Sequence, residues 1–406
     1  MNTTRTGRGT AARPGRLLRW GTAGAVLIAA AGTAAPAAAR EAPATTFIYH
    51  GPLYSVSADS PSDAWTVGIG ADYQKVVHWN GTGLAKVSRP AAVTNSQLFS
   101  VSATSADDAW AVGYQRPASI DQTFIVHWDG SHWAKVHSPN PPAANVPGTL
   151  LQDVSADSAS DAWAVGYYSS KTPDNAYRTL ILHWNGTSWA RIPSPNPGVK
   201  NSFLSSVSAD SATDAWAVGD YQTSSFAIKT LILHWDGTSW TQVTSPNPGG
   251  ASDGGDLNGI SASSATDAWA TGNYTDSSGV SVSLALHWDG TSWTQVSTPS
   301  PGGLDDTLLT GVTDLSPTNA WAVGQYRTGP HGKLPNTLAL HWDGTSWTQV
   351  TTPNPGGPGG SRLIDVSGTS ATDVWAVGTY NTASRPGNGR DHGLILHWDG
   401  TGWTQF

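Results

Sequence analysis

The sequence predicts an all-β fold, a seven-bladed β-propeller of four-stranded antiparallel blades. Three observations support this. A unit of about 53 residues recurs seven times, each unit holds four short β-rich runs separated by turn residues, and no unit shows a helical period. A four-stranded unit of this size could not bury its apolar faces alone, which disfavours a string of separate small domains. Stacking around an axis solves that problem.

We label the four runs of each unit strands a to d. In the fourth unit they span residues 204–209, 214–221, 230–236 and 239–243. Strand b carries an Asp-Ala-Trp-Ala-Val-Gly motif, strand c ends on His-Trp, and strand d starts on a further Trp, with Leu84 in the first copy. The repeated structural residues are Trp65, Trp110, Trp163, Trp216, Trp269, Trp321 and Trp375 in strand b and His78, His127, His183, His234, His287, His341 and His397 in strand c.

Each motif has a structural interpretation. Strand c is apolar at consecutive positions, as expected for a strand buried on both faces. The Asp-Gly after it predicts a hairpin to strand d. The repeated His residues stand at equivalent places in radiating blades and have no second ligand beside them, so we expect an internal hydrogen bond rather than a metal site. The Asp that precedes each strand-b Trp, replaced by Asn319 in the sixth copy, is expected to cap its turn. The Ser-Pro-Asn-Pro-Gly stretches should protect the outer strand edges.

The chain divides into three parts. Residues 1–39 carry five arginines, an apolar run and a closing Ala-Ala-Ala, the order typical of a secretory signal peptide; an uncleaved anchor is the alternative. Residues 40–52 form an N-terminal extension, in which TTFIYH (45–50) could add a ring-closing strand to the last blade. The propeller covers 53–406, with blades near 53–97, 98–150, 151–203, 204–256, 257–308, 309–362 and 363–406.

Composition narrows the function classes. The formal net charge is −8, and loss of the five arginines in 1–39, which contain no acidic residue, takes it to −13. Such a domain should repel nucleic acid and anionic membranes. The chain has no cysteine, so disulfides and thiol chemistry are excluded. We therefore predict a secreted, extracellular monomer that neither binds nucleic acid nor inserts into a membrane after signal cleavage.

The two faces of the predicted ring differ. The spacings that contain the a–b and c–d turns are constant in all copies, whereas the interval from the Gly of strand b to the His of strand c varies from Gly68–His78 to Gly378–His397. Variable loops are where binding usually resides. We therefore place function on the face of the b–c and d–a connections, here termed the variable face. The opposite, constant face is rich in Asp; a solvated surface explains this, and calcium or a cationic partner is the alternative.

The candidate binding residues lie on the variable face. Tyrosines follow strand b, and basic residues follow them in the same loops. Aromatic rings beside cations suit sugars, and a ring of such sites would bind multivalently; packing of the tyrosines between blades is the alternative. The candidates are Tyr114, Tyr168, Tyr221, Tyr274, Tyr326 and Tyr380, with Arg116, Arg178, Lys229, Arg327, Arg385 and Arg390.

Catalysis has weaker support. The arginines share no register, as convergence on one site would require, and near-identical blades disfavour a single active site. The carboxylate pairs Asp253 with Asp256 and Asp305 with Asp306 lie in Gly-rich loops typical of turns. We assign no catalytic residue, no metal ligand and no cofactor, with calcium on the Asp-rich face as the open alternative.

The repeats also resemble a known group. The valine-containing strand a, the Asp-Ala-Trp-Ala-Val-Gly strand and the Trp-Asp-Gly-Thr-Ser-Trp turn resemble secreted bacterial propellers with Asp-box, photosystem-assembly-factor and kelch-like repeats, although Asp and Gly are adjacent here, unlike in the Asp-box. That group includes enzymes, lectins and assembly factors, so the resemblance implies the fold only. Our hypothesis is a non-catalytic module that binds glycan or cell-wall polysaccharide. An extracellular protein-binding scaffold and, third, a glycoside hydrolase or lyase are the alternatives.

Overall fold

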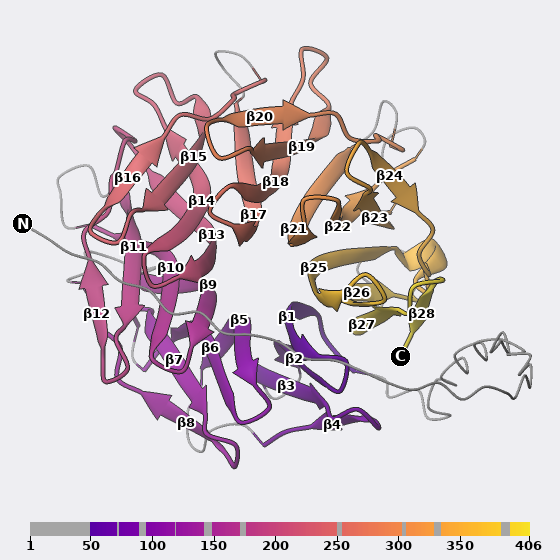
Figure 1. Ribbon diagram of the computed structural model, residues 1–406, viewed down its shortest axis with the longest axis horizontal. Helices are drawn as coiled ribbons and strands as arrows, with labels where there is room; N and C mark the ends of the chain where they lie inside the picture. The colour runs from indigo at the N-terminus through magenta and orange to yellow at the C-terminus, as the bar shows by residue number, and fades with distance from the viewer. Residues whose placement is uncertain are drawn as a thin grey trace, which may run out of the picture. The chain divides into compact units, whose positions relative to one another are not determined.

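A computed structural model describes residues 49–70, 73–88, 95–117, 119–141, 148–170, 176–249, 254–302, 306–328, 334–382 and 390–406. Seven antiparallel sheets of four strands each form a ring, with the first strand of every sheet innermost (Figure 1). This confirms the predicted seven-bladed β-propeller. Among the described residues, each sheet consists of four strands that are consecutive in the sequence.

The strands of the first four blades are β1 (Leu53–Ser60), β2 (Asp63–Gly70), β3 (Tyr73–Trp79), β4 (Leu84–Lys86); β5 (Ser96–Ser105), β6 (Asp108–Gln115), β7 (Gln122–Trp128), β8 (Trp133–Val136); β9 (Thr149–Ser158), β10 (Asp161–Ser169), β11 (Tyr177–Trp184), β12 (Trp189–Ile192); and β13 (Ser202–Ser211), β14 (Asp214–Gln222), β15 (Ile228–Trp235), β16 (Trp240–Val243). The remaining blades contain β17 (Gly255–Ser264), β18 (Asp267–Thr275), β19 (Ser281–Trp288), β20 (Trp293–Val296); β21 (Thr307–Ser316), β22 (Asn319–Tyr326), β23 (Asn336–Trp342), β24 (Trp347–Val350); and β25 (Ser361–Ser370), β26 (Asp373–Asn381), β27 (Asp391–Trp398), β28 (Trp403–Gln405).

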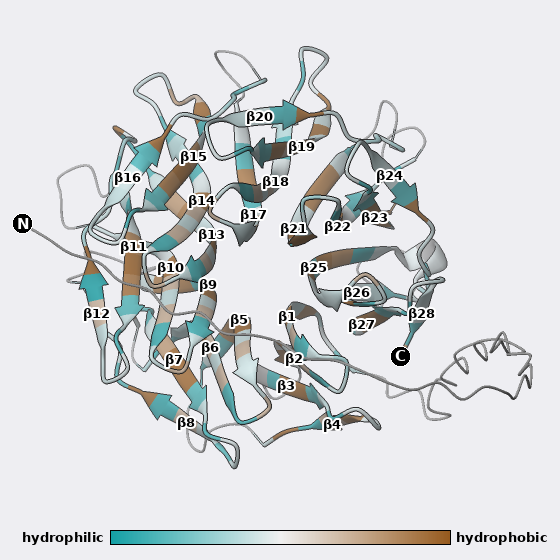
Figure 2. Ribbon diagram, in the orientation of Figure 1, coloured by the Kyte–Doolittle hydropathy of each residue, from teal (hydrophilic) through white to brown (hydrophobic). Residues whose placement is uncertain are grey.

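The core lies between blades rather than at the centre of the ring. Each hydrophobic cluster combines residues of two neighbouring blades; the second cluster, for example, joins Trp110 and Val112 of one blade to Leu180 and Trp189 of the next. Figure 2 shows the hydrophobic stretches on strands such as β11 and β15, while the outermost β12 and β16 are hydrophilic. Strand c is buried at four consecutive positions, as predicted, because both its faces contact neighbouring blades.

The repeated tryptophans form an aromatic belt through these clusters. In the third blade Trp163 stacks on His183, with ring centroids 4.2 Å apart, and contacts Trp235 and Trp240 of the next blade at 4.9 and 5.1 Å. Aromatic contacts of this geometry add to the energy of burial. The same set recurs between the other consecutive blades from the first to the seventh, which explains why the three tryptophans keep a fixed spacing.

The strand-c histidines make the internal hydrogen bond that we predicted. His287 Nε2 lies 2.7 Å from Asp267 Oδ1, and His341 Nε2 lies 2.9 Å from Asn319 Oδ1. The partner in each blade is the residue that opens strand b. Oδ1 of this residue bonds to a histidine 15 to 24 residues later in the sequence. The predicted role in the a–b turn holds in part: Asp267 Oδ2 accepts the hydroxyl of Ser263 across that turn at 2.7 Å, a side-chain donor rather than a backbone N–H.

Turn and edge chemistry follow the sequence closely. In the c–d turn of the fourth blade, Asp236 Oδ1 accepts the backbone N–H groups of Thr238 and Ser239 at 2.8 and 2.9 Å, while Gly237 takes φ +87°. The Ser-Pro-Asn-Pro stretch then folds back along strand c, where Asn247 Oδ1 accepts the N–H of Thr230. These stretches therefore cover the edge that strand d leaves exposed.

The ring closes between the seventh and first blades by contacts found nowhere else among the described residues. The first blade has Leu84 where the others have a strand-d Trp, and the C-terminal Phe406 packs instead against Trp375 and Trp79, with centroids 5.3 and 5.5 Å away. Residues 49–51 pair with the start of β27: the N–H of Gly393 donates to Tyr49 O. Residues 45–48 of the proposed closing strand lie outside the described residues.

Candidate functional site

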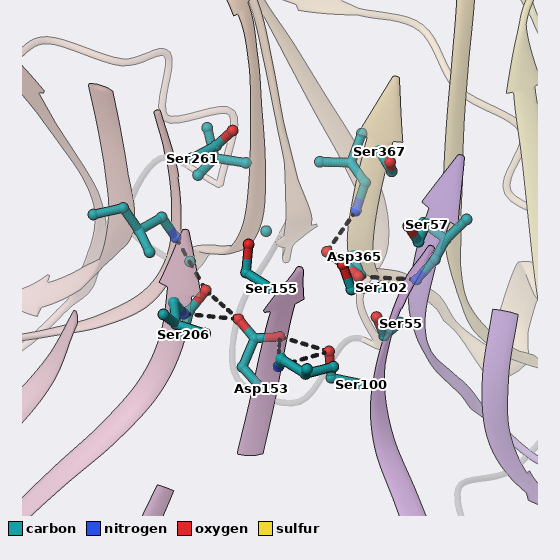
Figure 3. A pocket seen from close by; sticks show the side chains of 18 of the residues that line it. Ser55, Ser57, Ser100, Ser102, Asp153, Ser155, Ser206, Ser261, Asp365 and Ser367 are labelled. Carbon is teal, nitrogen blue, oxygen red and sulfur yellow. Dashed lines mark hydrogen bonds between the residues drawn. The ribbon is translucent and has the colours of Figure 1, made fainter. Parts of the chain in front are cut away.

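The innermost strands enclose a polar channel of about 370 Å³ along the axis of the ring. Its wall contains a ring of hydroxyl side chains (Figure 3). Each of six of these accepts a backbone N–H of the following blade at 2.9–3.1 Å; for example, the N–H of Ala103 donates to Ser57 Oγ. The hydroxyl ring is Ser57, Ser102, Ser155, Ser208, Ser261, Thr313 and Ser367. Its first role is thus to join blades.

Two aspartates interrupt a second ring of small residues in the same channel. Asp153 accepts hydrogen bonds from Ser100 Oγ at 2.6 Å and Ser206 Oγ at 2.7 Å, and also from the N–H of Val207 at 2.9 Å (Figure 3). Asp365 accepts the N–H of Val56 at 2.9 Å. Burial raises the pKa of both, that of Asp365 to about 7, and the charge of Asp153 adds to the shift at Asp365. With their oxygens occupied by such donors, these carboxyls are clamps between blades.

The channel opens on the variable face through a mouth built from three positions per blade. Strand a starts and strand b ends on this face, so these positions lie together at its inner rim. The first position is the β-bulge residue of strand a, which lines the channel. The second position lies two residues before the bulge. The third position follows the Gly of strand b and is the cross-strand partner of the second. Bulges commonly re-aim side chains next to functional sites.

These mouth positions differ from blade to blade, although the rest of the repeat is nearly constant. No residue type recurs at the bulge, and only one recurs at each of the other two positions. The bulge residues are Tyr54, Phe99, Gln152, Ser205, Asn258, Thr310 and Ile364; the earlier residues are Pro52, Gln97, Leu150, Phe203, Asp256, Leu308 and Arg362; and the strand-b residues are Ile69, Tyr114, Tyr167, Asp220, Asn273, Gln325 and Thr379.

The mouth has aromatic side chains on one arc. Tyr54 and Phe99 meet edge to face at 5.9 Å, Phe99 lies 5.7 Å from Tyr114, and the hydroxyl of Tyr114 donates to Gln97 Oε1 at 3.3 Å. All four side chains are half-buried, so they keep exposed surface at the rim. Burial raises the pKa of Tyr54, which keeps its hydroxyl neutral as a hydrogen-bond donor.

Aromatic packing continues in the third and fourth blades. Tyr167 contacts Phe203 edge to face at 4.9 Å and Tyr177 at 5.4 Å. Burial also raises the pKa of Tyr167. The aromatic arc of the mouth therefore extends across four adjacent blades.

The next arc presents carboxyl and amide groups. Asn273 Nδ2 donates to Asp256 Oδ1 at 2.7 Å, and Asn258 Nδ2 donates to Asn273 Oδ1 at 3.3 Å. Burial, together with the charge of Asp256, raises the pKa of Asp220 to about 7. Burial raises the pKa of Asp256 as well. This arc offers both hydrogen-bond donors and acceptors at neutral pH.

The strand-b tyrosines separate into two groups. Tyr168, Tyr221, Tyr274, Tyr326 and Tyr380 are half-buried and pack against the inter-blade clusters, which is the alternative that we left open. Tyr114 stands one residue earlier in strand b, since it pairs with Gln97 whereas Tyr221 pairs with Ser202. It therefore points to the other face of its sheet and belongs to the mouth.

The basic candidates are engaged locally and do not form one site. Arg116 makes a two-pronged ion pair with Asp121, at 2.6 and 3.0 Å, and lies over the ring of Tyr114. Arg178 donates to the backbone oxygen of Lys200, and Arg327 lies 3.8 Å from Asp306. Of the other three basic candidates, Lys229 pairs with Tyr221 across strands b and c, Arg390 is exposed, and Arg385 is outside the described residues.

The carboxylate and metal predictions have mixed outcomes. Asp253 and Asp305 fall outside the described residues, whereas Asp256 faces Asp220 of the preceding blade and Asp306 faces Arg327. In the described ranges no group of three or more His, Asp or Glu side chains is placed to hold a metal ion. Calcium on the constant face stays an untested prediction. In those ranges, too, no helix has the length and apolar character needed to cross a membrane.

Sequence reasoning directed attention to loops and missed the strand ends of the mouth. The signal was available in the repeats themselves, because the bulge position is the one place in strand a where every copy differs. Only Tyr114 and Asp256 of the mouth were among our candidates. The other mouth residues could not be recognised, because a single residue such as Ser205 or Ile364 does not indicate a binding site. The site forms only when the seven blades bring these residues together.

Comparisons with known proteins agree with the fold. No family model matches the chain, and no curated protein matches its sequence. Among solved structures, YCF48 bound to D1 peptide is similar (TM-score 0.51, 13% identity, 86% of this chain and 94% of that one). The propeller domain of the Trilobed protease from Pyrococcus furiosus, with an open velcro topology, is similar too (0.52, 10%, 89% and 98%). So is an ulvan lyase, a polysaccharide lyase bound to its saccharide (0.55, 9%, 89% and 96%). At these identities the likeness establishes the fold alone.

Proposed function

We propose that this chain is a secreted, non-catalytic recognition module that binds carbohydrate on its variable face, at the channel mouth. The observation that carries the proposal is the mouth itself: an aromatic arc beside an arc of carboxyl and amide groups, at positions that diverge in an otherwise uniform repeat. Aromatic rings pack on the apolar faces of sugars, and carboxyl and amide groups exchange hydrogen bonds with hydroxyls. One mouth per ring gives one principal site.

The surroundings of the protein are part of the same proposal. The order of charged, apolar and small segments in residues 1–39 supports export, and the net charge of −8 supports a partner other than nucleic acid or an anionic membrane. We propose that the mature chain is an extracellular monomer. The Trp belt packs between the blades and contains none of the mouth residues, so the recognition surface is separate from this part of the core.

An extracellular protein-binding scaffold is the second candidate. It is favoured by the single, non-repeating character of the mouth, which would suit one peptide segment; YCF48, similar in fold, was solved with a D1 peptide. A lyase or hydrolase is the third candidate, and its support is the facing pair Asp220 and Asp256, because burial and the charge of Asp256 raise the pKa of Asp220 to about 7, a range suited to proton transfer.

Glycan-array screening of the mature protein, followed by calorimetry with the best oligosaccharide, tests the proposal. We expect one site per ring and about fivefold weaker binding for Phe99→Ala, which removes an aromatic contact worth about 1 kcal/mol. Tyr221→Phe is the control, because it keeps the packing ring of a tyrosine assigned to the blade interface. About seven equivalent sites, lost with the strand-b tyrosines, would contradict the mouth. Cleavage of the oligosaccharide would favour the enzyme.

A further inference from the structure

A basic and apolar surface lies on the outer rim of the variable face, around the b–c loop of the fourth blade. Three of its side chains are large, apolar and exposed: Phe226 at 63%, Val199 at 60% and Ile228 at 42% of their surface. Only Ile120 joins them in this class among the described residues. We name the surface formed by residues 199–201 and 222–229, with Arg178, the Phe226 rim.

The Phe226 rim is one connected unit. The N–H of Lys200 donates to Gln222 O at 3.4 Å, and Asn201 Nδ2 donates to Gln222 Oε1 at 3.2 Å. Arg178 Nη1 reaches the backbone oxygen of Lys200 at 3.0 Å. The connection between the third and fourth blades is therefore bonded to the b–c loop that carries Phe226.

The backbone presents Phe226 outward at an energetic cost. Its φ is +66°, and the only other described non-glycine residue with positive φ is Asn95, a type that tolerates this region. Two hydrogen bonds close the loop, from the N–H of Thr223 to Ala227 O at 2.9 Å and from the N–H of Phe226 to Thr223 O at 3.0 Å. A bulky residue held in a left-handed conformation with its ring in solvent is not explained by packing, and such strain is concentrated at functional sites.

One positive charge lies over this ring on a protein that is acidic overall. The ammonium of Lys200 lies over the Phe226 ring, 5.5 Å from its centroid, and no ion pair in the described residues includes Lys200. Lys229 follows Ile228 directly. No acidic residue occurs in 176–201 or 221–235, although the formal net charge of the chain is −8. The rim thus combines the ammonium of Lys200 with an exposed aromatic ring.

We propose that the Phe226 rim binds an anionic sugar unit, a uronate or sulfated residue of a polysaccharide. The Phe226 ring would pack on the apolar face of the pyranose, and the ammonium of Lys200 would bind the acidic group. A sugar ring that carries an acidic group beside an apolar C–H face matches an aromatic ring that has an ammonium group beside it. This inference rests on the proposed carbohydrate-binding function and adds the ligand class and a second contact region outside the channel mouth.

The experiment compares two oligosaccharides of one skeleton, a galacturonic acid hexamer and its methyl ester, by calorimetry at low salt. We expect the acid to bind at least tenfold more tightly than the ester. Phe226→Gly should weaken the binding of both hexamers about fivefold, because both pack on this ring, while the melting temperature stays equal or rises, because Gly adopts positive φ without strain. Lys200→Gln should remove the preference for the acid, and Thr238→Ala, on the constant face, is the matched control.

The outcomes separate the two proposals. Equal affinity for acid and ester, an unchanged preference in Lys200→Gln, or unchanged affinities in Phe226→Gly would overturn the rim site, whereas binding that is lost in Phe99→Ala keeps the mouth. Binding of neither hexamer, together with an empty glycan array, overturns the proposed function. Tighter binding of polyglutamate than of the galacturonic acid hexamer, lost in Phe226→Gly, would overturn the sugar assignment in favour of an acidic peptide.

Discussion

Removal of the C-terminal ring at the closing seam should destabilise the propeller measurably. Phe406 takes the place of the strand-d Trp that the first blade lacks, in contact with Trp375 and Trp79. A fully buried Phe→Ala substitution costs about 3–5 kcal/mol. Because Phe406 is half-buried, we expect about 2 kcal/mol for Phe406→Ala. With an unfolding entropy of about 2.1 cal/mol/K per residue over roughly 360 residues, this corresponds to a melting temperature lower by about 3 °C.

The assay is guanidinium unfolding followed by tryptophan fluorescence, with calorimetry for the melting temperature. Phe406→Trp should retain stability, because Trp fills the equivalent place between other blades. Thr404→Ala is the control on the exposed side of β28 and should change stability by less than about 0.5 kcal/mol. If Phe406→Ala unfolds like the unsubstituted protein, the seam does not depend on this ring, and our account of closure is refuted.

Three further predictions concern the seam and the buried carboxyls. Gly393→Thr introduces the residue that most other blades have at this position. It should lower the melting temperature by several degrees, because the new Cβ would lie 3.0–3.1 Å from atoms of Leu53 and Tyr49. An unchanged melting temperature would mean that residues 49–51 do not pack there. Asp153→Ala should cost about 2–4 kcal/mol and Asp153→Ser about half of that in guanidinium unfolding, since Ser still accepts the N–H of Val207; equal costs would contradict the clamp. Burial raises the pKa of Asp314 to about 8, so the contribution of this carboxyl to folding stability is complete at acid pH and is lost as pH rises through that value. Asp314→Ala should therefore raise the melting temperature more at pH 9 than at pH 5, and a shift independent of pH would oppose this.

The repeat carried enough information to predict the architecture. Strand c reads as apolar at consecutive positions only because both its faces are covered, and that pattern occurs in every copy. The Asp-Gly turn, the proline-containing edge and the histidine bond are local or confined to one blade, so spacing within a unit was sufficient to place them. The turn role assigned to the strand-b Asp is incomplete, because one oxygen bonds across the a–b turn while the other bonds to the histidine of strand c, which the turn sequence does not reveal.

The binding face was predicted, but the residues on it were largely not. Tyr114 and Tyr168 look equivalent in the sequence, yet a one-residue offset in strand b puts their side chains on opposite faces of the sheet. The five tyrosines that stand one residue later in strand b, as Tyr168 does, pack against the hydrophobic clusters between blades. The basic residues were selected by their loops, and in the structure Arg116 is paired with Asp121 inside its own loop.

By itself, the sequence determined the number of blades, the order of strands and the constant face, because these depend on spacings repeated within one unit. Tertiary structure alone decided what the variable face offers. Asp220 and Asp256, or Tyr54 and Gln97, belong to different blades, and their chemistry appears only when a ring brings strands about one repeat apart to the same mouth. Tertiary structure also decided how the ring closes, since Phe406 can replace the missing strand-d tryptophan only where the last blade meets the first.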